Sequence, residues 1–354
     1  MMLAHLALSA LLIGEQSTIV GEGSSPQMAV DARGTVRMVF GRKDTILVAT
    51  SKDGGRTFGA PLTVGVVGGM HLGNTRGPTI ASSRSRSVIV AANTAGQLPA
   101  FQLDHSRAQW TPIRGAINDV EGSAPEGLAT IAANDANAFH TVWLDLREGR
   151  KNNIYFSAVP ATGARRAPDR ALYKSPDGHV CECCRPTIAV SGRHVAVMFR
   201  NWLAGARDMY LTTSSDGGKN FSPAQKLGEG SWKLDACPMD GGSLVIGAGG
   251  EVASVWRRET TVYYARPGER EIPLGEGRSP MMSRQGSATY VVWEERSTIK
   301  LGWPGSAIVT NVGEGRHPQV LALPNGRVVV AWEKDGRVRV QSYDMSPHHS
   351  HEGM

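Results

Sequence analysis

The sequence predicts an all-β fold in which one domain forms a β-propeller of seven four-stranded blades. Three observations predict it: a short phrase that recurs seven times, a Val- and Trp-rich strand after each copy, and a tight-turn motif in two matched copies. The chain has 354 residues, of which 41% are hydrophobic and 42 are glycines. That length suits a single all-β domain, because propellers routinely exceed the usual domain size.

The recurring phrase consists of a glycine-rich turn, a residue that precedes proline, and an apolar strand. It reads GEGSSPQMAV, GNTRGPTIAS, CECCRPTIAV, DACPMDGGSLVI, GEGRSPMMS and GEGRHPQVLA, and a seventh start, APEGLATIAA, lacks the proline step. The units start near residues 26, 78, 127, 186, 238, 280 and 318. Self-similarity at this period is typical of propellers and solenoids.

Each start is followed by further short strands. The second strands are VRMVFG, SVIVAAN, HTVWLDL, HVAVMFR, VASVWRR, TYVVWEE and VVVAWEK, and third strands include NNIYFSAV, TVYYARP and RVRVQSYD. Runs of β-branched and aromatic residues between Gly, Pro and Asp indicate β-strands.

The last unit has only three strands before the tail begins at Ser346. The phrase STIVGEGSSP over residues 17–26 matches the fourth-strand phrases EIPLGEGRSP and AIVTNVGEGRHP, so we expect residues 17–20 to supply the missing strand. Such an exchange closes the ring and removes exposed strand edges. The predicted organisation is therefore residues 1–14 as a secretory signal or an apolar N-terminal segment, 15–345 as the propeller, and 346–354 as a His-rich tail.

The turn motif has a physical basis. An Asp side chain in a tight turn accepts hydrogen bonds from the next backbone N–H groups, and glycine supplies the positive φ of the reversal. The closing Phe is expected to be largely buried against the neighbouring strands. The two copies consist of Ser51, Asp53, Gly55 and Phe58, and of Ser214, Asp216, Gly218 and Phe221.

These two copies resemble the Asp box, or BNR repeat, of sialidase-like β-propellers, and the resemblance extends over nearly the whole chain. Sialidases have six blades, so six is the alternative to the count of seven. The resemblance implies that the boxes join the third strand of a blade to the fourth, opposite the ligand face. The ligand face is then built by blade-to-blade loops and by the loops between second and third strands.

Placed by that rule, several arginines converge on the ligand face. Sialidases bind the carboxylate of their sugar with three arginines, and bidentate Arg–carboxylate pairs suit this task. The alternative is that these arginines pair with acids at strand ends. The candidate ligand-binding residues are Arg147, Arg200 and Arg257 after second strands, Arg76 and Arg185 before first strands as an outer ring, and Asp145.

One departure from the family argues against sialidase chemistry. The family's Arg-Ile-Pro motif would place an arginine before Pro26, and Ser25 stands there. A Tyr nucleophile with a Glu, such as Tyr263 or Tyr264 with Glu259, is not enforced by any spacing, so no catalytic residue is assigned. The prediction is a ligand-binding propeller; the alternatives are a glycoside hydrolase acting on an acidic sugar, a soft-metal protein, or a scaffold.

All four cysteines lie in two consecutive blade-to-blade loops. An even count in an exported protein indicates disulfides, and Cys237 could pair with Cys183 or Cys184. Three cysteines within four residues also suit a soft metal such as copper or zinc. The sequence leaves both open. With its CxCC and CPM segments the chain resembles a branch of secreted Asp-box proteins that carry both. The candidate metal ligands are Cys181, Cys183, Cys184, Cys237, His179 and Met239.

The composition limits the classes of partner that we expect the protein to bind. The net charge is +6 with a pI near 9.2, but the Lys and Arg are dispersed, which argues against a nucleic-acid surface. No window approaches the roughly 20 apolar residues of a membrane span. The apolar run LALSALLIG favours a secreted or periplasmic location, although no Lys or Arg precedes it. The expected partner is a small molecule, a glycan or a metal ion.

Overall fold

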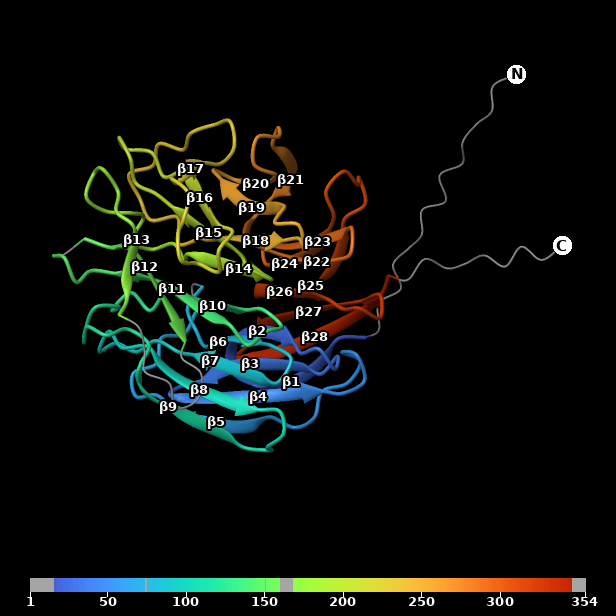
Figure 1. The fold of residues 1–354 in the computed structure, drawn as a ribbon. Helices are drawn as coiled ribbons and strands as arrows, with labels where there is room; N and C mark the ends of the chain where they lie inside the picture. The colour runs from blue at the N-terminus through green and yellow to red at the C-terminus, as the bar shows by residue number, and fades with distance from the viewer. Residues whose placement is uncertain (1–15, 74, 150, 160–167, 346–354) are drawn as a thin grey trace, which may run out of the picture.

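The computed structural model describes residues 16–73, 75–149, 151–159 and 168–345. Within these ranges every regular element is a strand, and the strands form seven four-stranded antiparallel sheets. Figure 1 shows the sheets following one another around a ring, with colours running from blue to red in chain order. The seven-bladed propeller predicted from the repeat is confirmed, and the six-bladed alternative is wrong.

The first four blades follow the repeat starts closely. Blade 1 is β2 (Ser24–Val30), β3 (Val36–Arg42), β4 (Thr45–Ser51) and β5 (Leu62–Val66); blade 2 is β6 (Thr79–Ser82), β7 (Arg86–Val90), β8 (Pro99–Asp104) and β9 (Trp110–Ala116); blade 3 is β10 (Ala129–Ala133), β11 (Phe139–Asp145), β12 (Asn153–Val159) and β13 (Arg170–Tyr173); blade 4 is β14 (Thr187–Ser191), β15 (His194–Arg200), β16 (Met209–Ser214) and β17 (Gln225–Lys226).

The last three blades complete the ring. Blade 5 is β18 (Gly242–Ile246), β19 (Val252–Arg258), β20 (Thr261–Ala265) and β21 (Ile272–Glu276); blade 6 is β22 (Arg278–Gln285), β23 (Ala288–Glu295), β24 (Thr298–Gly302) and β25 (Thr310–Glu314); blade 7 is β26 (Arg316–Ala322), β27 (Arg327–Lys334), β28 (Arg337–Asp344) and β1 (Thr18–Glu22).

Strand β1 closes the ring as expected. It pairs antiparallel with β28, with Ile19 opposite Arg339 and Glu22 opposite Arg337. Figure 1 shows β1 beside the red strands of the last blade. The pairing covers the outer edge of blade 7, which would otherwise present unpaired backbone groups. The predictions for residues 1–14 and 346–354 concern segments outside the described residues.

A hydrophobic cluster fills each interface between neighbouring blades. Blades 3 and 4, for example, share a cluster in which Val142 and Phe156 meet Val197 and Phe199. Corresponding clusters join the other six pairs, including blade 7 with blade 1. The Trp residues of the second strands explain the Val/Trp pattern, because Trp143, Trp293 and Trp332 are fully buried. Burial of this apolar area stabilises the closed ring.

Both turn motifs lie between the third and fourth strands of a blade, after β4 and after β16. In the first, Asp53 accepts hydrogen bonds from the backbone N–H groups of Arg56 (3.1 Å) and Thr57 (3.0 Å), and Gly55 N donates to Ser51 Oγ (2.9 Å). The second repeats the pattern around Asp216, with Lys219 N and Asn220 N both at 2.9 Å. The two copies are therefore alike in structure as well as in sequence.

Two details of these turns matter. Gly54, Gly55, Gly217 and Gly218 all have φ between 72° and 83°, which favours glycine. Phe58 and Phe221 are partly buried against neighbouring clusters, whereas we expected them to be largely buried. Among the described residues, no helix is long and apolar enough to cross a membrane.

Candidate functional site

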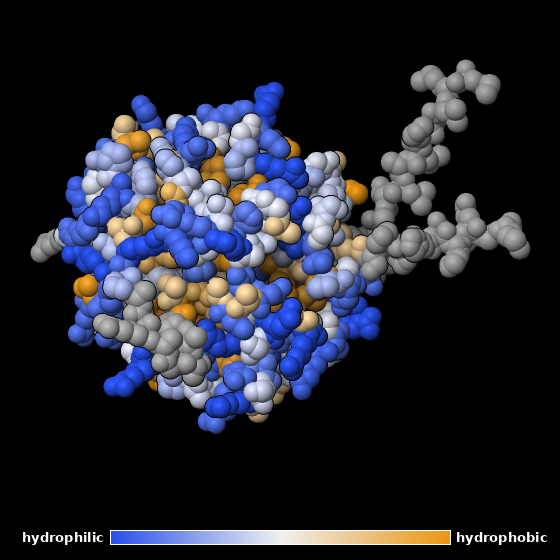
Figure 2. Space-filling model, in the orientation of Figure 1, coloured by the Kyte–Doolittle hydropathy of each residue, from blue (hydrophilic) through white to orange (hydrophobic). Residues whose placement is uncertain are grey.

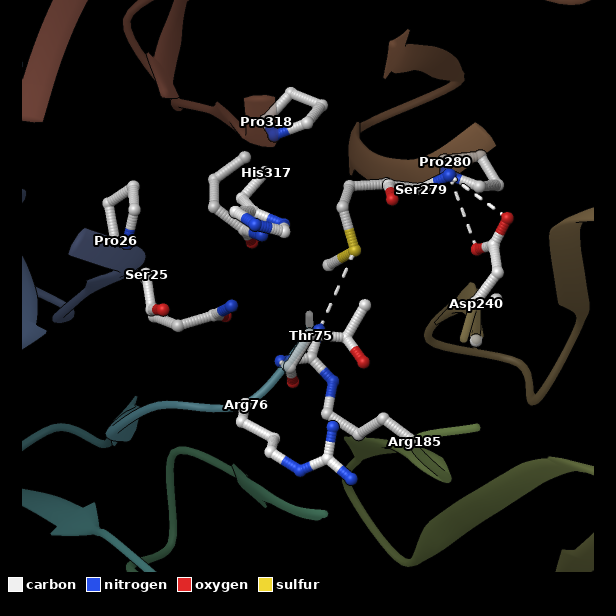
Figure 3. A pocket seen from close by; sticks show the side chains of 15 residues that line it. Ser25, Pro26, Thr75, Arg76, Arg185, Asp240, Ser279, Pro280, His317 and Pro318 are labelled. Carbon is white, nitrogen blue, oxygen red and sulfur yellow. Dashed lines mark hydrogen bonds between the residues drawn. The ribbon is translucent and has the colours of Figure 1, made fainter. Parts of the chain in front are cut away.

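A pocket lies on the axis of the propeller, where the first strands of most blades begin. Because the strands of a blade alternate in direction, this end lies opposite the turn motifs. Figure 3 shows the pocket from close by. It is lined by Ser25, Pro26, Gln27, Thr75, Arg76, Arg185, Asp240, Gly241, Gly242, Ser279, Pro280, Met281, His317, Pro318 and Gln319, from blades 1, 2, 4, 5, 6 and 7.

The recurring residue before proline forms much of this wall. Ser25, Ser279 and His317 each precede a proline and have φ of 57°, 51° and 55°, a conformation that costs energy for residues other than glycine. At each of these positions the first strand shifts register against the second. The bulge turns the residue before proline toward the axis. The repeated phrase is thus the device that supplies pocket side chains.

Arg185 is the main charged group of the pocket. It is 7% exposed, and within the described ranges its guanidinium donates only to the Thr75 carbonyl oxygen (Nη1, 3.2 Å) and to Met281 Sδ (Nη2, 3.8 Å). No ion pair to a carboxylate is found for it among the described residues. Burial lowers the pKa of Arg185 to about 10, so the side chain is still cationic at pH 7. A buried cation without a counter-charge is costly.

Two further polar groups of the pocket have no hydrogen-bond partner among the described residues. They are Thr75 Oγ1 and His317 Nδ1, both buried. Figure 3 shows His317 on the side of the pocket opposite Thr75 and Arg185. Burial, with smaller contributions from Arg316, Arg278 and Arg185, lowers the pKa of His317 to about 4, so the imidazole is neutral at pH 7. Buried polar groups are nearly always paired, so these two indicate a ligand or ordered water.

Asp240 is the one carboxylate that lines the pocket, and it already has partners. Arg257 Nε lies 2.8 Å from Asp240 Oδ2, and Ser279 N donates to both carboxylate oxygens at 3.1–3.2 Å. Burial raises the pKa of Asp240, while Arg257 and Arg200 oppose the rise. The Asp240 carboxylate therefore pairs with Arg257 and not with Arg185.

The other arginines named from the sequence have different surroundings. Arg147 is surrounded by acids: its guanidinium lies 2.8 Å from Asp145, 3.0 Å from Asp169 and 2.6 Å from Asp119. The hydrogen bonds that Arg147 donates to these carboxylates raise its pKa against the effect of burial. Neither Arg147 nor Asp145 lines the pocket, so the structure separates them from Arg185.

Arg200 and Arg257 lie together beside the pocket. Arg200 donates to the carbonyl oxygens of Arg207 (2.7 Å) and Arg257 (2.9 Å), and both guanidinium groups lie 5.2 Å from the ring centre of Trp232. Arg76 lines the pocket but also contacts Glu126 (Nη2 to Oε2, 3.3 Å). The structure therefore brings Arg76 and Arg185 to the centre, where the sequence suggested an outer ring, and leaves Arg185 without an acid.

The CxCC segment forms a compact thiol cluster behind the pocket wall, directly before Arg185. The ligand atoms of Cys181, Cys183 and Cys184 all lie within 4.8 Å of one another, with Cys181 Sγ 3.7 Å from Cys183 Sγ and 3.3 Å from Cys184 Sγ. All three are buried, and Met239 packs against them. The contact with Met239 joins the two cysteine-bearing loops, as the repeat predicted.

Two named residues lie at the edge of this cluster. Cys237 is exposed and does not belong to the group within 4.8 Å. His179 is also outside that group; its ring stacks on Trp202 at 5.8 Å, and its Nδ1 lies 3.0 Å from the Val180 carbonyl oxygen. The cluster of described ligand atoms is therefore composed of sulfur alone.

The pKa values of the three thiols are shifted in different directions. Cys181 Sγ accepts a hydrogen bond from Arg207 Nη1 at 3.0 Å, and it shares thiol hydrogen bonds with Cys183 and Cys184. The thiol hydrogen bonds, then Arg200 and Arg207, hold the pKa of Cys181 well below its usual range. The pKa of Cys183 is raised mainly by its hydrogen bond to Cys181, and that of Cys184 mainly by burial. Of the three thiols, Cys181 is the one whose surroundings favour the thiolate.

Sequence reasoning missed three of these residues as site members. His317 carried a signal, because it occupies the same position before proline as Ser25 and Ser279. Thr75 and Arg207 carried none: each acts through contacts with residues more than 20 positions away, such as Arg185 and Cys181.

No family model matches the chain, and no curated protein matches it. Several solved structures share its fold. A lectin from Burkholderia pseudomallei has a TM-score of 0.65 at 11% identity, covering 92% of this chain and 97% of the lectin chain. An ulvan lyase has a TM-score of 0.58 at 10% identity, covering 93% and 95%. A Penicillium chrysogenum α-L-arabinanase has a TM-score of 0.53 at 12% identity, covering 95% and 99%.

At these identities the likeness shows the propeller fold, which this chain shares with glycan-active proteins. The finer resemblance to sialidases stays a prediction.

Proposed function

We propose that this protein is a ligand-binding propeller whose axial pocket takes a carboxylate group, with an acidic sugar as the expected class of ligand. The observation that carries the proposal is Arg185, a buried guanidinium in the pocket without a carboxylate partner among the described residues. A fold tolerates such a charge when a ligand supplies the counter-charge. The proposal includes an extracytoplasmic location, which the apolar start of the sequence favours.

The groups around Arg185 suit a carboxylate. The free Thr75 hydroxyl can donate to one oxygen, and neutral His317 can donate from Nδ1 when the proton is on that nitrogen. The guanidinium of Arg185 can bind the same group in a charge-assisted pair. Asp240 is held by Arg257 and does not compete for Arg185.

The size of the pocket limits what can enter. The space between its atoms is about 440 Å³, part of it open to solvent, but the cavity volume is only about 30 Å³. A water molecule needs roughly 10–15 Å³ on that measure, so the enclosed part holds a group of two or three heavy atoms. A carboxylate fits, whereas a whole sugar ring would lie across the pocket mouth and contact the surrounding loops.

Two of the similar structures support an acidic glycan as the class of ligand. One is an ulvan lyase bound to a glucuronic acid-containing saccharide, and another is a lectin. We extend to this chain only the class of an acidic glycan. Figure 2 shows hydrophilic residues over most of the face seen in Figure 1, with apolar residues near its centre.

Hydrolysis is the second candidate, and one observation weighs against it. None of the residues that line the pocket is a tyrosine, and Ser25 occupies the wall where a sialidase would place its first arginine. Ser25 is instead engaged structurally, since its Oγ accepts a hydrogen bond from Gly73 N (2.9 Å). We expect no turnover of a fluorogenic sialoside.

Calorimetric titration with glucuronate and with glucose tests the proposal, because the two sugars differ in a carboxylate. We expect glucuronate to bind and glucose not to bind. Arg185→Met should weaken glucuronate binding about 10- to 100-fold, which is the range of a lost charged hydrogen bond. Arg42→Met, at an exposed arginine that ends β3, is the matched control and should bind as the wild type does. Equal binding of both sugars, or unchanged binding by Arg185→Met, would contradict the proposal.

A further inference from the structure

The thiol cluster is a second site, separate in chemistry from the axial pocket. Cys181, Cys183 and Cys184 are 0%, 5% and 1% exposed, and their sulfur atoms face one another. The backbone fixes this geometry: Cys181 N donates to the Arg200 carbonyl oxygen (3.0 Å), and Val180 forms a bridge with Asn201. The loop is therefore held against the end of β15.

The separations match a shared metal ion. At a metal–sulfur distance of about 2.3 Å, two ligand sulfurs lie roughly 3.8 Å apart in tetrahedral geometry and about 4.0 Å apart in trigonal geometry. The observed separations from Cys181 Sγ are 3.3 and 3.7 Å. Small side-chain shifts would open the group to hold an ion at its centre.

The surroundings supply what a thiolate site needs. Arg207 Nη1 lies 3.0 Å from Cys181 Sγ, and Arg200 adds a second positive charge near the thiols. Three thiolates around a monovalent ion carry a net charge of −2, which two guanidinium groups can offset. Met239 packs on the same cluster and offers a thioether as a fourth soft donor.

The donor set distinguishes between metals. Thiolate and thioether ligands select copper(I), whereas structural zinc sites are completed by a fourth Cys or by His. Among the described His, Cys, Asp and Glu residues, only the three cysteines form a group that could hold an ion. Cys237 and His179, which would complete a zinc site, lie outside it.

We propose that Cys181, Cys183 and Cys184, with Met239 alongside, bind one copper(I) ion. Because Cys184 directly precedes Arg185, the ion would also hold the chain segment that carries the pocket arginine. A disulfide between Cys181 and Cys184 is the competing outcome. It would require the sulfurs to approach from 3.3 Å to about 2.05 Å and to close a loop of four residues.

The test uses the full chain, purified without an added tag, in anaerobic titration with copper(I) against a competing chromophoric chelator. We expect one tightly bound copper(I) per chain, a higher melting temperature with copper(I), and sulfur-only ligation by X-ray absorption. Thiol titration of the denatured, unreduced protein should find all four thiols free. Ligation by nitrogen would point to the tail histidines and overturn the proposal.

Single substitutions distinguish the contributions of the individual sulfur atoms to copper(I) binding. Cys183→Ser should weaken copper(I) binding by at least about 100-fold, and Met239→Leu by about 10-fold, since a thiolate contributes more than a thioether. Cys237→Ser is the matched control, because it removes an exposed thiol from the neighbouring loop, and it should bind copper(I) as the wild type does.

Loss of binding in Cys237→Ser would overturn the three-sulfur site in favour of one that includes the exposed thiol. Two missing thiols in the unreduced wild type would overturn it in favour of a disulfide. If Cys183→Ser fails to fold, the copper(I) stoichiometry of the wild type and its X-ray absorption spectrum still show whether three sulfur atoms bind one ion.

Discussion

Arg147 and Arg185 are both mostly buried arginines at the pocket end of neighbouring blades, yet their surroundings differ completely. Arg147 lies within 3.0 Å of three carboxylates, and two of these, on Asp145 and Asp169, are fully buried. In the part of the chain that the structure describes, Arg185 has only a carbonyl oxygen and a thioether as partners. A cation that its own fold neutralises serves stability, whereas one left without a counter-charge is available to a ligand.

The largest effect should come from the neutralised member of this pair. Arg147→Met leaves the buried carboxylate of Asp145 without its counter-charge, which should lower the free energy of unfolding by about 3–5 kcal/mol. Urea denaturation measures it. A loss below about 1 kcal/mol would mean that the acids rearrange, and that Arg147 is not a structural centre.

Acid should destabilise the protein through a buried histidine. Burial, with a smaller effect of Arg170, lowers the pKa of His140 to about 4, below the 6.5 of an unfolded chain. The unfolded state therefore takes up a proton first, and stability present above pH 6.5 is lost as the pH falls toward 4. Wild type should lose about 2–3 kcal/mol more over this range than His140→Gln does. Parallel pH profiles of unfolding would contradict this.

The turn motifs contrast with the pocket, because they lie at the opposite end of the blades and should affect stability alone. Asp53→Ala leaves the N–H groups of Arg56 and Thr57 without their acceptor, but the turn is exposed, so water should limit the cost to about 1 kcal/mol. Glucuronate binding should be unchanged. Weakened binding would link the two faces, against this account.

The same turn has a pH signature. Hydrogen bonds from Thr57, Ser51 and Arg56 outweigh desolvation and lower the pKa of Asp53 to about 2, from 3.8. Its contribution is therefore present above pH 3.8 and is lost as the pH falls toward 2. The stability difference between wild type and Asp53→Ala should shrink over that interval in urea denaturation. A constant difference would contradict the hydrogen-bonded carboxylate.

The smallest expected effect is on the pH dependence of binding. His317 stays neutral above a pKa of about 4, and Arg185 stays charged below about 10, so neither of these two groups changes charge between pH 6 and 8. Calorimetry should give the same dissociation constant for glucuronate at both ends of this range. A tenfold change would show that another titrating group contacts the ligand.

The repeat and turn chemistry allowed the fold to be predicted, including the exchange that pairs β1 with β28, because both depend on local patterns. The functional site was harder to predict from the sequence. The sequence placed Arg147, Arg200 and Arg185 on one face, but it could not show that Asp119 and Asp169 surround the first of these. The sequence also could not show whether Cys237 joins the thiol cluster, because that depends on the direction of its side chain. Met239, two residues later, packs on the thiols, whereas Cys237 is exposed to solvent.

The central claim is that Arg185 is kept in the fold for a ligand, and unfolding with and without glucuronate tests it most directly. Without ligand, Arg185→Met should unfold at the same or a higher urea concentration than wild type, because it removes an uncompensated buried charge. Glucuronate at 100 times its dissociation constant should stabilise wild type by about 2.7 kcal/mol and leave Arg185→Met nearly unaffected. A ligand-free Arg185→Met that loses several kcal/mol, as Arg147→Met should, and a wild type indifferent to glucuronate would contradict the account.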